Sequence, residues 1–321
     1  MKITLAGTIT LPEVGDIHMK IPRREFIGKS ALVVGGLMLG TALPSLAASE
    51  AANFDPYEIV PLGKPGLKVS RVCIGTGSNG FFRSSNQTRL GRNSFEALLR
   101  GAYDRGIRMF DLADAYGSHS YLIPALKGIP RRDFVAVTKI WRGEGGLPEP
   151  ERPDADVVVA RFLKEIQTDY LDLVLLHCLT SGNWPEEQHR QMDLLSKLKE
   201  KGVIRALGVS CHSIPALEAA ANEPWVESVH ARINPYGASM DGPPREVVPV
   251  LKKIHAAGKG VVGMKIIGAG EFSNSDEMRN RSVRFALRLG CVDVLNVGFE
   301  NHDQIDDLAV RVRNVPRPVV E

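Results

Sequence analysis

Residues 171–177, which read LDLVLLH, decide the fold of this chain. Apart from Asp172 and the final His177 the stretch is apolar, and its apolar residues do not alternate with polar ones. A strand with one face in water alternates, whereas a parallel strand covered on both faces is apolar along its length. Residues 186–202 follow with apolar side chains spaced three and four apart, which is typical of an amphipathic helix. The stretch therefore predicts a buried parallel strand followed by a covering helix.

The same strand–helix unit recurs along the chain, about eight times between residues 69 and 312. Eight such units in about 250 residues predict an α/β fold of the (β/α)8 TIM barrel class. A doubly wound open sheet is the alternative, but no G-x-G-x-x-G segment opens a helix. Before the first unit, residues 57–69 predict a β-hairpin that caps the bottom of the barrel. The expected strands are residues 69–75, 108–112, 134–140, 171–177, 203–210, 228–233, 260–266 and 292–298, and the expected helices are 92–106, 120–128, 154–167, 186–202, 216–222, 245–258, 276–290 and 302–312.

The beginning of the chain has the pattern of an export signal. Arg23 and Arg24 precede Phe26, an apolar run follows, and small residues ending at Ala47 suit cleavage by a signal peptidase. The arginine pair predicts a twin-arginine signal, read by a bacterial machinery that moves folded proteins across the inner membrane. An ordinary secretory signal and an uncleaved anchor are the alternatives.

This signal sets the expected domain boundaries. Residues 1–47 are the predicted signal peptide, and Met19 begins a better-formed charged region than the residues before it, so we expect it to be the true start. Residues 48–56 are then a linker, and residues 57–321 form a single domain. We expect that domain to be exported, to the periplasm.

Composition excludes some classes of partner. A formal net charge of +3 leaves no basic footprint for nucleic acid. No long apolar run follows the N-terminal region, so we expect no stable membrane span after processing. The four cysteines have no C-x-x-C spacing, which argues against structural zinc and iron–sulfur clusters; they are Cys73, Cys178, Cys211 and Cys291.

Ionisable residues cluster at the C-terminal ends of the predicted strands, where barrels of this class place their chemistry. Asp111 is near the end of the second strand and Tyr116 follows it, Lys139 lies on the third strand, and His177 ends the fourth. A nearby ammonium lowers the pKa of a tyrosine from its usual value near 10, and a buried lysine needs a counter-charge such as Asp111. We therefore expect Tyr116 to be a general acid for a carbonyl oxygen, and His177 to contact the same oxygen. Reduction of the carbonyl carbon would also need a separate hydride donor.

Residues 57–313 resemble the aldo-keto reductase family. The family's D-x-A-x-x-Y-G signature is present at residues 111–117, which read DLADAYG; its strand-three lysine matches Lys139 and its strand-four histidine matches His177. The resemblance implies NAD(P)H-dependent reduction of an aldehyde or ketone, or oxidation of the alcohol. Tyr116 would be the general acid/base, assisted by the matched aspartate, lysine and histidine, and the substrate a small carbonyl or sugar-like compound.

The resemblance also implies where a nicotinamide cofactor binds. Residues 208–213, GVSCHS, resemble the segment that holds the nicotinamide, with Cys211 where many members have asparagine. Residues 263–270, GMKIIGAG, resemble the segment that stacks on it, with Met264 in place of an aromatic residue. Residues 297–307 resemble the phosphate and adenosine segment. The implied cofactor residues are Gly75, Thr76, Ser210, Cys211, Met264, Lys265, Gly298, Glu300, Gln304 and Asp307.

The cofactor segment departs from the family at Glu300. Many members place a lysine or arginine there for the 2′-phosphate of NADP(H), whereas a carboxylate repels that phosphate and suits a ribose hydroxyl. We therefore expect weakened preference for NADP(H) or use of NAD(H), although Lys265 can still reach a phosphate. A periplasm offers little free cofactor, so we expect tight binding before export and transfer of cofactor and protein together.

Two tryptophans, Trp141 and Trp184, are expected to line the substrate pocket and stack on a sugar or an aromatic carbonyl compound. Three polar residues nearby are expected to lie in solvent: Asp114, His119 and His212.

Two other functions stay open from the residues alone. A cofactor-binding sensor or interaction module with little turnover would fit the departures at Cys211 and in the phosphate segment. His177-Cys178 and Cys211-His212 end neighbouring predicted strands and could bind a metal, or the two cysteines could pair in an oxidising compartment. Buried strand cysteines are more often small apolar residues, so the main prediction includes no metal.

Overall fold

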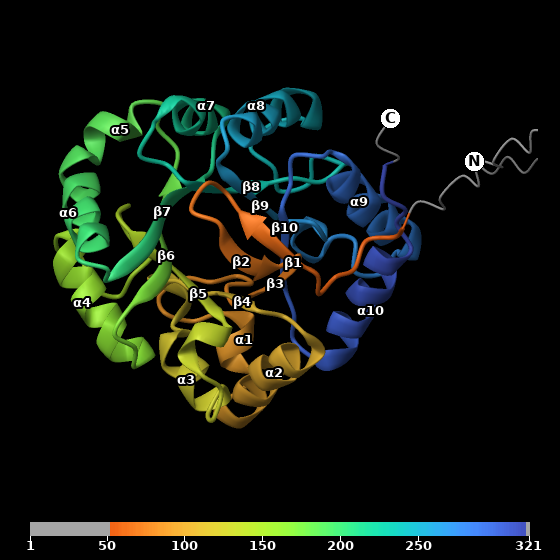
Figure 1. The fold of residues 1–321 in the computed structure, drawn as a ribbon, viewed down its shortest axis with the longest axis horizontal. Helices are drawn as coiled ribbons and strands as arrows, with labels where there is room; N and C mark the ends of the chain where they lie inside the picture. The colour runs from red at the N-terminus through yellow and green to blue at the C-terminus, as the bar shows by residue number, and fades with distance from the viewer. Residues whose placement is uncertain (1–51, 319–321) are drawn as a thin grey trace, which may run out of the picture. The chain divides into compact units, whose positions relative to one another are not determined.

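The computed structural model describes residues 52–318. The predicted signal at residues 1–47 and the expected start at Met19 lie outside the described residues. Eight parallel strands form a closed barrel in the order β10-β3-β4-β5-β6-β7-β8-β9, and helices surround it (Figure 1). The predicted (β/α)8 barrel is therefore confirmed.

Strands and helices alternate along the chain as expected. The barrel strands are β3 (Val72–Gly75), β4 (Met109–Asp111), β5 (Val135–Trp141), β6 (Leu171–Leu179), β7 (Ile204–Cys211), β8 (Ser228–Arg232), β9 (Gly260–Met264) and β10 (Val294–Gly298). The helices are α1 (Asn86–Arg89), α2 (Arg92–Arg105), α3 (His119–Ala125), α4 (Ala155–Ile166), α5 (Trp184–Glu187), α6 (His189–Glu200), α7 (Ile214–Asn222), α8 (Pro244–Ala256), α9 (Asp276–Arg288) and α10 (His302–Arg313).

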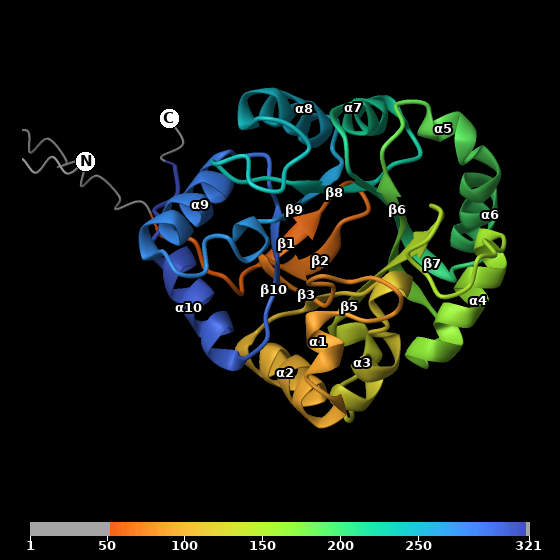
Figure 2. The ribbon, with the colours of Figure 1, turned by 180° about the vertical axis from the view of Figure 1, so that it is seen from behind.

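An antiparallel hairpin of β1 (Ile59–Leu62) and β2 (Leu67–Ser70) precedes the barrel, as predicted. Both views show it in the centre of the ring of strands (Figures 1 and 2). Its apolar side chains belong to the same buried cluster as Met109 and Val135, which begin β4 and β5. The hairpin therefore closes the barrel at the N-terminal ends of the strands.

The predicted strand at residues 69–75 is wrong in its continuity. β2 ends at Ser70 and β3 begins at Val72. The Ser70 hydroxyl donates to the Val72 carbonyl at 2.6 Å, and the intervening Arg71 pairs with Glu58. The chain turns here because it leaves the hairpin and enters the barrel.

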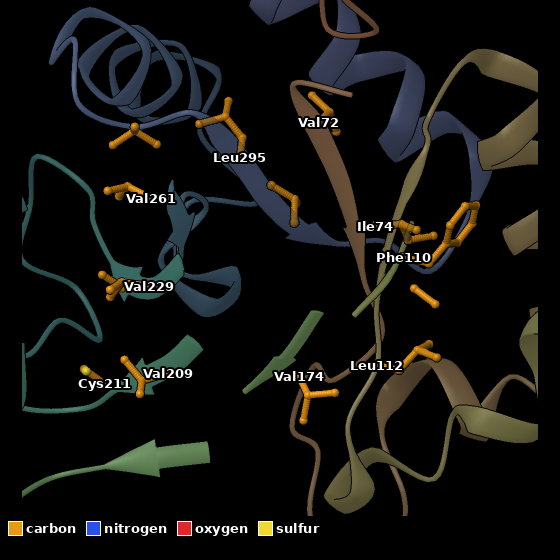
Figure 3. Close-up of a cluster of buried hydrophobic side chains, with 14 of the residues drawn as sticks. Val72, Ile74, Phe110, Leu112, Val174, Val209, Cys211, Val229, Val261 and Leu295 are labelled. Atoms are coloured by element: carbon orange, nitrogen blue, oxygen red, sulfur yellow. The ribbon is translucent and has the colours of Figure 1, made fainter. Parts of the chain in front are cut away.

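Strand side chains alternate between two buried layers. Outward-facing residues such as Val174 and Val209 belong to the large outer cluster, which helix residues share (Figure 3). Inward-facing residues such as Leu173 and Val137 fill the barrel. Because the strand period is two, the inward residues of the strand ends meet at one mouth, and this alternation positions the site.

Candidate active site

The last inward-facing positions of the strands are rich in polar side chains. Their inward direction follows from the alternation of side chains along a strand. Each lies an even number of residues after a member of the inner apolar cluster, or has outer-cluster residues on both sides in the sequence. The structure thus brings the predicted residues of the second to fifth barrel strands to one mouth. These inward positions are Gly75 on β3, Asp111 on β4, Lys139 on β5, His177 on β6, Ser210 on β7, His230 on β8 and Asn296 on β10.

Lys139 and Asp111 form a buried ion pair. Lys139 Nζ donates to Asp111 Oδ1 at 2.5 Å and to the Leu112 carbonyl at 3.0 Å, and the side chains are 0% and 4% exposed. Burial opposes a charge on Asp111, but Lys139 and then His230 outweigh it and hold the pKa of the carboxyl below its usual range. The lysine charge is therefore balanced inside the barrel.

Tyr116 lies over this pair. It ends a 3₁₀ turn, Asp114–Tyr116, and its ring centre is 4.8 Å from Lys139 Nζ. Burial, and after it the charge of Asp111, raises the pKa of Tyr116 well above its ordinary value. The expectation of a lowered pKa is therefore wrong, because burial and then the charge of Asp111 outweigh the nearby positive charge. The phenol therefore keeps its proton at neutral pH and can donate it.

His177 faces the phenol. Its Nε2 is 3.3 Å from the Tyr116 hydroxyl, and the two rings meet edge to face at 5.5 Å. Burial, followed by the charge of Lys139, lowers the pKa of His177 well below 6.5. A neutral imidazole and a protonated phenol therefore converge on one point, where both can contact a substrate oxygen.

Sequence reasoning missed two neighbours of Asp111. Asn296 Nδ2 donates to Asp111 Oδ2 at 2.6 Å, and His230 Nε2 lies 3.5 Å from Asp111 Oδ1. Both occupy inward positions on strands that were predicted. Counting by two from inward-facing Val294 would have found Asn296 from the sequence.

The loop after β3 covers Tyr116. A Cβ on Gly77 would lie 2.3 Å from Tyr116 Cζ, and one on Gly80 would lie 2.5 Å from Tyr116 Cδ1. Arg83 anchors the loop, since its Nε donates to Asp114 Oδ1 at 3.3 Å. The two glycines leave room for the phenol ring, so this loop shapes the site.

Trp141, a predicted pocket residue, lies next to His177. Its ring centre lies 5.3 Å from that of His177 and 5.4 Å from that of Phe81. The ring centres of Phe81 and Phe82 are 6.2 Å apart, and both phenylalanines are more than half exposed. The side chains of His177, Trp141, Phe81 and Phe82 form an aromatic wall that runs outward from the Tyr116–His177 pair. The two phenylalanines were not predicted.

Trp184 does not reach the mouth. It is 1% exposed, and its Nε1 donates to the Ala216 carbonyl at 3.1 Å. It begins α5 and anchors that short helix against α7. The assignment of Trp184 to the substrate pocket is therefore wrong, because both the ring and its N–H are used in packing.

Two of the residues expected in solvent are buried. Asp114 Oδ2 accepts a hydrogen bond from Arg161 Nη2 at 2.6 Å. His119 Nδ1 lies 2.6 Å from Glu165 Oε2, and His119 Nε2 lies 2.7 Å from Thr138 Oγ1. Both side chains are less than 6% exposed. Asp114 therefore supports the turn that carries Tyr116, and neither residue is a solvated loop residue.

His212, the third such residue, belongs to the mouth. Arg232 donates to its Nδ1, and its Nε2 lies 3.2 Å from Ser210 Oγ and 3.5 Å from Cys178 Sγ. A guanidinium only donates, so Nδ1 accepts and Nε2 carries the proton. Burial and then Arg232 lower the pKa of His212 to about 3, so the ring is neutral.

Cys211 does not face the mouth. It follows inward-facing Ser210, so its side chain points into the outer layer (Figure 3), where its thiol donates to the Ala216 carbonyl at 3.5 Å. The expectation that Cys211 holds the cofactor is therefore wrong for its side chain, whereas the side chain of Ser210 faces the mouth.

Met264 and Lys265 lie at the end of β9. Lys265 has a left-handed backbone with φ of 59°, an uncommon conformation that costs energy for this residue type. Burial and then Arg232 lower the pKa of Lys265. Two cations therefore lie close together beside the mouth, and Asp241 Oδ1, 3.3 Å from Arg232 Nη1, balances one of them.

Thr76 and Gly298 support the loop after β3. Thr76 Oγ1 donates to the Asp111 carbonyl at 2.8 Å. A Cβ on Gly298 would lie 2.2 Å from Ser78 Oγ. Thr76 therefore ties the loop to β4, and Gly298 leaves room for Ser78.

The remaining predicted cofactor residues lie where β10 leads into α10. Glu300 Oε1 accepts from Asn86 Nδ2 at 2.6 Å, and the Glu300 N–H donates to Gln304 Oε1 at 2.8 Å. Asp307 is paired with Arg311 at 2.6 Å. Asn86 belongs to α1, which is part of the connection between β3 and α2. That connection therefore contacts the segment between β10 and α10 through the Asn86–Glu300 hydrogen bond.

In this structure Cys178 and Cys211 are free thiols with different neighbours. Within residues 52–318, no three His, Cys, Asp or Glu side chains are grouped to hold a metal ion. Over the same part of the chain, none of the helices has both the length and the apolar character needed to cross a bilayer.

A tyrosine–histidine pair over a buried lysine–aspartate pair, at the C-terminal end of a (β/α)8 barrel, defines an acid–base site of the barrel class. A model of the Aldo/keto reductase family matches residues 72–309. The chain therefore belongs to this family, whose members are in general NAD(P)-dependent oxidoreductases.

Individual relatives are distant. Probable aldo-keto reductase 1 from Glycine max is 25% identical over 71% of this chain and 65% of its own length, and aldo-keto reductase YhdN from Bacillus subtilis is 28% identical over 61% and 58%. The chain thus spans less than two thirds of these relatives. Among solved structures, the putative aldo-keto reductase PA4992 from Pseudomonas aeruginosa is 25% identical with a TM-score of 0.65, covering 83% of this chain and 98% of that one. An aldo/keto reductase from Klebsiella pneumoniae, solved with NADP and acetate, shares the fold at 20% identity and a TM-score of 0.59, covering 80% and 90%.

Proposed function

We propose that this chain reduces an aldehyde or ketone with a nicotinamide cofactor, or oxidises the corresponding alcohol, with Tyr116 as the proton donor or acceptor. The observation that carries the proposal is the 3.3 Å contact between the Tyr116 hydroxyl and His177 Nε2, beside the buried Lys139–Asp111 pair. A phenol with a raised pKa is protonated when the carbonyl binds. It can therefore hydrogen-bond the oxygen and transfer its proton as negative charge develops there.

The residues at the mouth fit a nicotinamide cofactor. Ser210 is inward-facing and buried, Met264 offers a polarizable thioether for a ring, and Lys265 offers positive charge for a phosphate. A bound cofactor would supply the hydride. His177 would orient the substrate oxygen, and Lys139 and Asp111 would hold the face of the Tyr116 ring.

We propose NAD(H) as the better-bound form. Glu300 puts a carboxylate where the segment meets the adenosine end, and Asn86 holds that carboxylate in place at 2.6 Å. A fixed carboxylate favours a ribose diol and repels a 2′-phosphate. The family relative solved with NADP shows that the other form is used elsewhere, so dissociation constants for NADH and NADPH decide the question; tighter NADPH binding contradicts the proposal.

The aromatic wall supports a substrate with an apolar or aromatic group beyond its carbonyl. Phe81 and Phe82 expose more than half their surface on a loop anchored by Arg83, and covering them with a ligand would be favourable. Phe81→Ala should lower kcat/KM for benzaldehyde-type substrates and change it little for small aliphatic aldehydes. Equal losses for both classes would contradict this role.

We also propose export of the folded, cofactor-loaded protein through a twin-arginine signal at residues 1–47. The pairing of Arg23 with Arg24 and the small residues ending at Ala47 support it. Replacing both arginines with lysine should retain the protein in the cytoplasm. In a separate measurement on wild-type protein recovered from the periplasm, mass spectrometry of the released nucleotide should find stoichiometric NAD(H). An empty protein would contradict pre-loading.

The proposed reaction is tested with Tyr116→Phe, which keeps the ring packed against Gly77 and Gly80. Carbonyl reduction should be lost while cofactor affinity is unchanged. Cofactor binding by both proteins, with no carbonyl reduction by either, would favour a sensor in place of an enzyme.

A further inference from the structure

Asp111 is held through both carboxylate oxygens, and they depend on different partners. Asp111 Oδ1 accepts a hydrogen bond from Lys139 Nζ at 2.5 Å, and His230 Nε2 lies 3.5 Å from the same oxygen. Oδ2 receives Asn296 Nδ2 at 2.6 Å, and among residues 52–318 it has no other hydrogen-bonding partner. A buried carboxylate oxygen that loses its donor loses stabilisation that water cannot replace.

Asn296 reaches Asp111 across an intervening strand. Asn296 is on β10 and Asp111 on β4, with β3 between them. A Cβ on Gly75, on β3, would lie 2.7 Å from Asn296 Oδ1. Gly75 is not among the residues with positive φ, so glycine is needed here for space and not for backbone conformation.

We propose that Asn296 is a positioning residue, whose hydrogen bond to Asp111 fixes the Asp111–Lys139 pair against the face of Tyr116. Gly75, which resemblance assigned to the cofactor, has the further role of admitting Asn296. The kinetic consequences rest on the proposed function. The hold of Asn296 on ionised Asp111 does not, and it can be measured separately.

The proposal has a direction in pH. A hydrogen bond to the charged form of a carboxyl lowers its pKa, so removing the Asn296 amide should raise the pKa of Asp111. Asp111 and Tyr116 are faced by ionisable groups from several elements, and these are left intact: Cys73 on β3, Lys139 on β5, His177 and Cys178 on β6, and His230 and Arg232 on β8.

The first experiment needs no turnover. Carbon-13 NMR of aspartate carboxyls, with Asp111 assigned from Asp111→Asn, follows its titration in wild type and in Asn296→Leu, a variant of similar size without the donor. We expect the midpoint of Asp111 to rise by about one unit or more. Ser228→Ala is the control, because its buried hydroxyl lies on an inward position of β8 without a partner in residues 52–318, and it should leave Asp111 unchanged.

The second experiment uses Asn296→Asp, which has the same shape and also serves if the leucine variant does not fold. When protonated, the new carboxyl can donate to Asp111 as the amide does; when ionised, it repels Asp111. Carbonyl reduction by this variant should therefore approach wild type at low pH and fall as pH rises, with the loss in kcat and about twofold or less in KM. A merely structural role would lower activity equally at every pH.

Gly75→Ala completes the test. If glycine makes room for Asn296, the loss from Gly75→Ala should be much smaller in an Asn296→Ala background than in wild type. An unchanged Asp111 midpoint in Asn296→Leu, or a parallel pH profile in Asn296→Asp, overturns the proposal. A wild type without carbonyl reduction would instead refute the proposed function, and the NMR titration would still decide the role of Asn296.

Discussion

Lys139 Nζ lies 4.8 Å from the centre of the Tyr116 ring while it donates to Asp111 Oδ1 at 2.5 Å. The ammonium therefore contacts the face of the phenol, and its charge is balanced before it can favour a phenolate. The pair packs against the ring, and in the proposed reaction the phenol is the acid.

Removing one member of the buried pair should destabilise the fold. Lys139→Met leaves the Asp111 carboxylate uncompensated, which typically costs about 3–5 kcal/mol. Urea unfolding measures this free energy. The double variant Lys139→Met/Asp111→Leu should recover much of the loss. A loss in the double variant equal to the sum of the losses of Lys139→Met and Asp111→Leu would show that the pair is not coupled.

The rate of reduction should be flat through neutral pH. The pKa of Tyr116 is raised above its ordinary value near 10, and the pKa of His177 is lowered below 6.5. The phenol therefore stays protonated and the imidazole neutral over this range, and kcat/KM reports these free-enzyme groups. A limb near pH 6.5 that disappears in His177→Asn would contradict the assigned protonation states.

Gly77→Ala should displace the loop after β3 or the phenol. The added Cβ would lie 2.3 Å from Tyr116 Cζ, and misplacing a reacting group by about 1 Å can cost roughly 100-fold in rate. Gly143→Ala is the matched control near the mouth, since its Cβ would meet Trp141 at an ordinary 3.5 Å. Comparable kcat/KM for the two variants would rule out the loop as a constraint on Tyr116.

Glu300→Lys should shift preference toward NADPH. Replacing a carboxylate by an ammonium removes the repulsion of a 2′-phosphate, and a change of about 1.4 kcal/mol is tenfold in affinity. The ratio of the NADPH and NADH dissociation constants measures the effect. Asp303→Lys, in the first turn of α10, which begins two residues after Glu300, controls for general charge. An equal shift in both variants would remove Glu300 from this role.

The sequence predicted the barrel because burial on both faces leaves a local pattern. LDLVLLH at residues 171–177 shows that pattern without help from the rest of the chain. Asp111, Tyr116, Lys139 and His177 followed from strand ends and from the family signature. The break at Arg71 was not predictable in this way, because it depends on contacts with Glu58 and Val72 that form only in the folded chain.

The finer properties of the site depend on three-dimensional neighbours. Trp184 looks like a pocket residue until its indole is seen to donate to the Ala216 carbonyl. The raised pKa of Tyr116 comes from burial beside Asp111, which no sequence spacing reveals. Asn296 lies 185 residues from Asp111 in the chain, and only closure of the barrel brings β10 within reach of β4.

The most direct test of Tyr116 as general acid is a single-turnover measurement. Wild type and Tyr116→Phe, each loaded with reduced cofactor, are mixed with an aromatic aldehyde, and the loss of cofactor absorbance is followed. We expect a rate at least about 100-fold lower for Tyr116→Phe, with the dissociation constant of the cofactor unchanged. Equal rates in the two proteins would show that the proton comes from a group other than Tyr116.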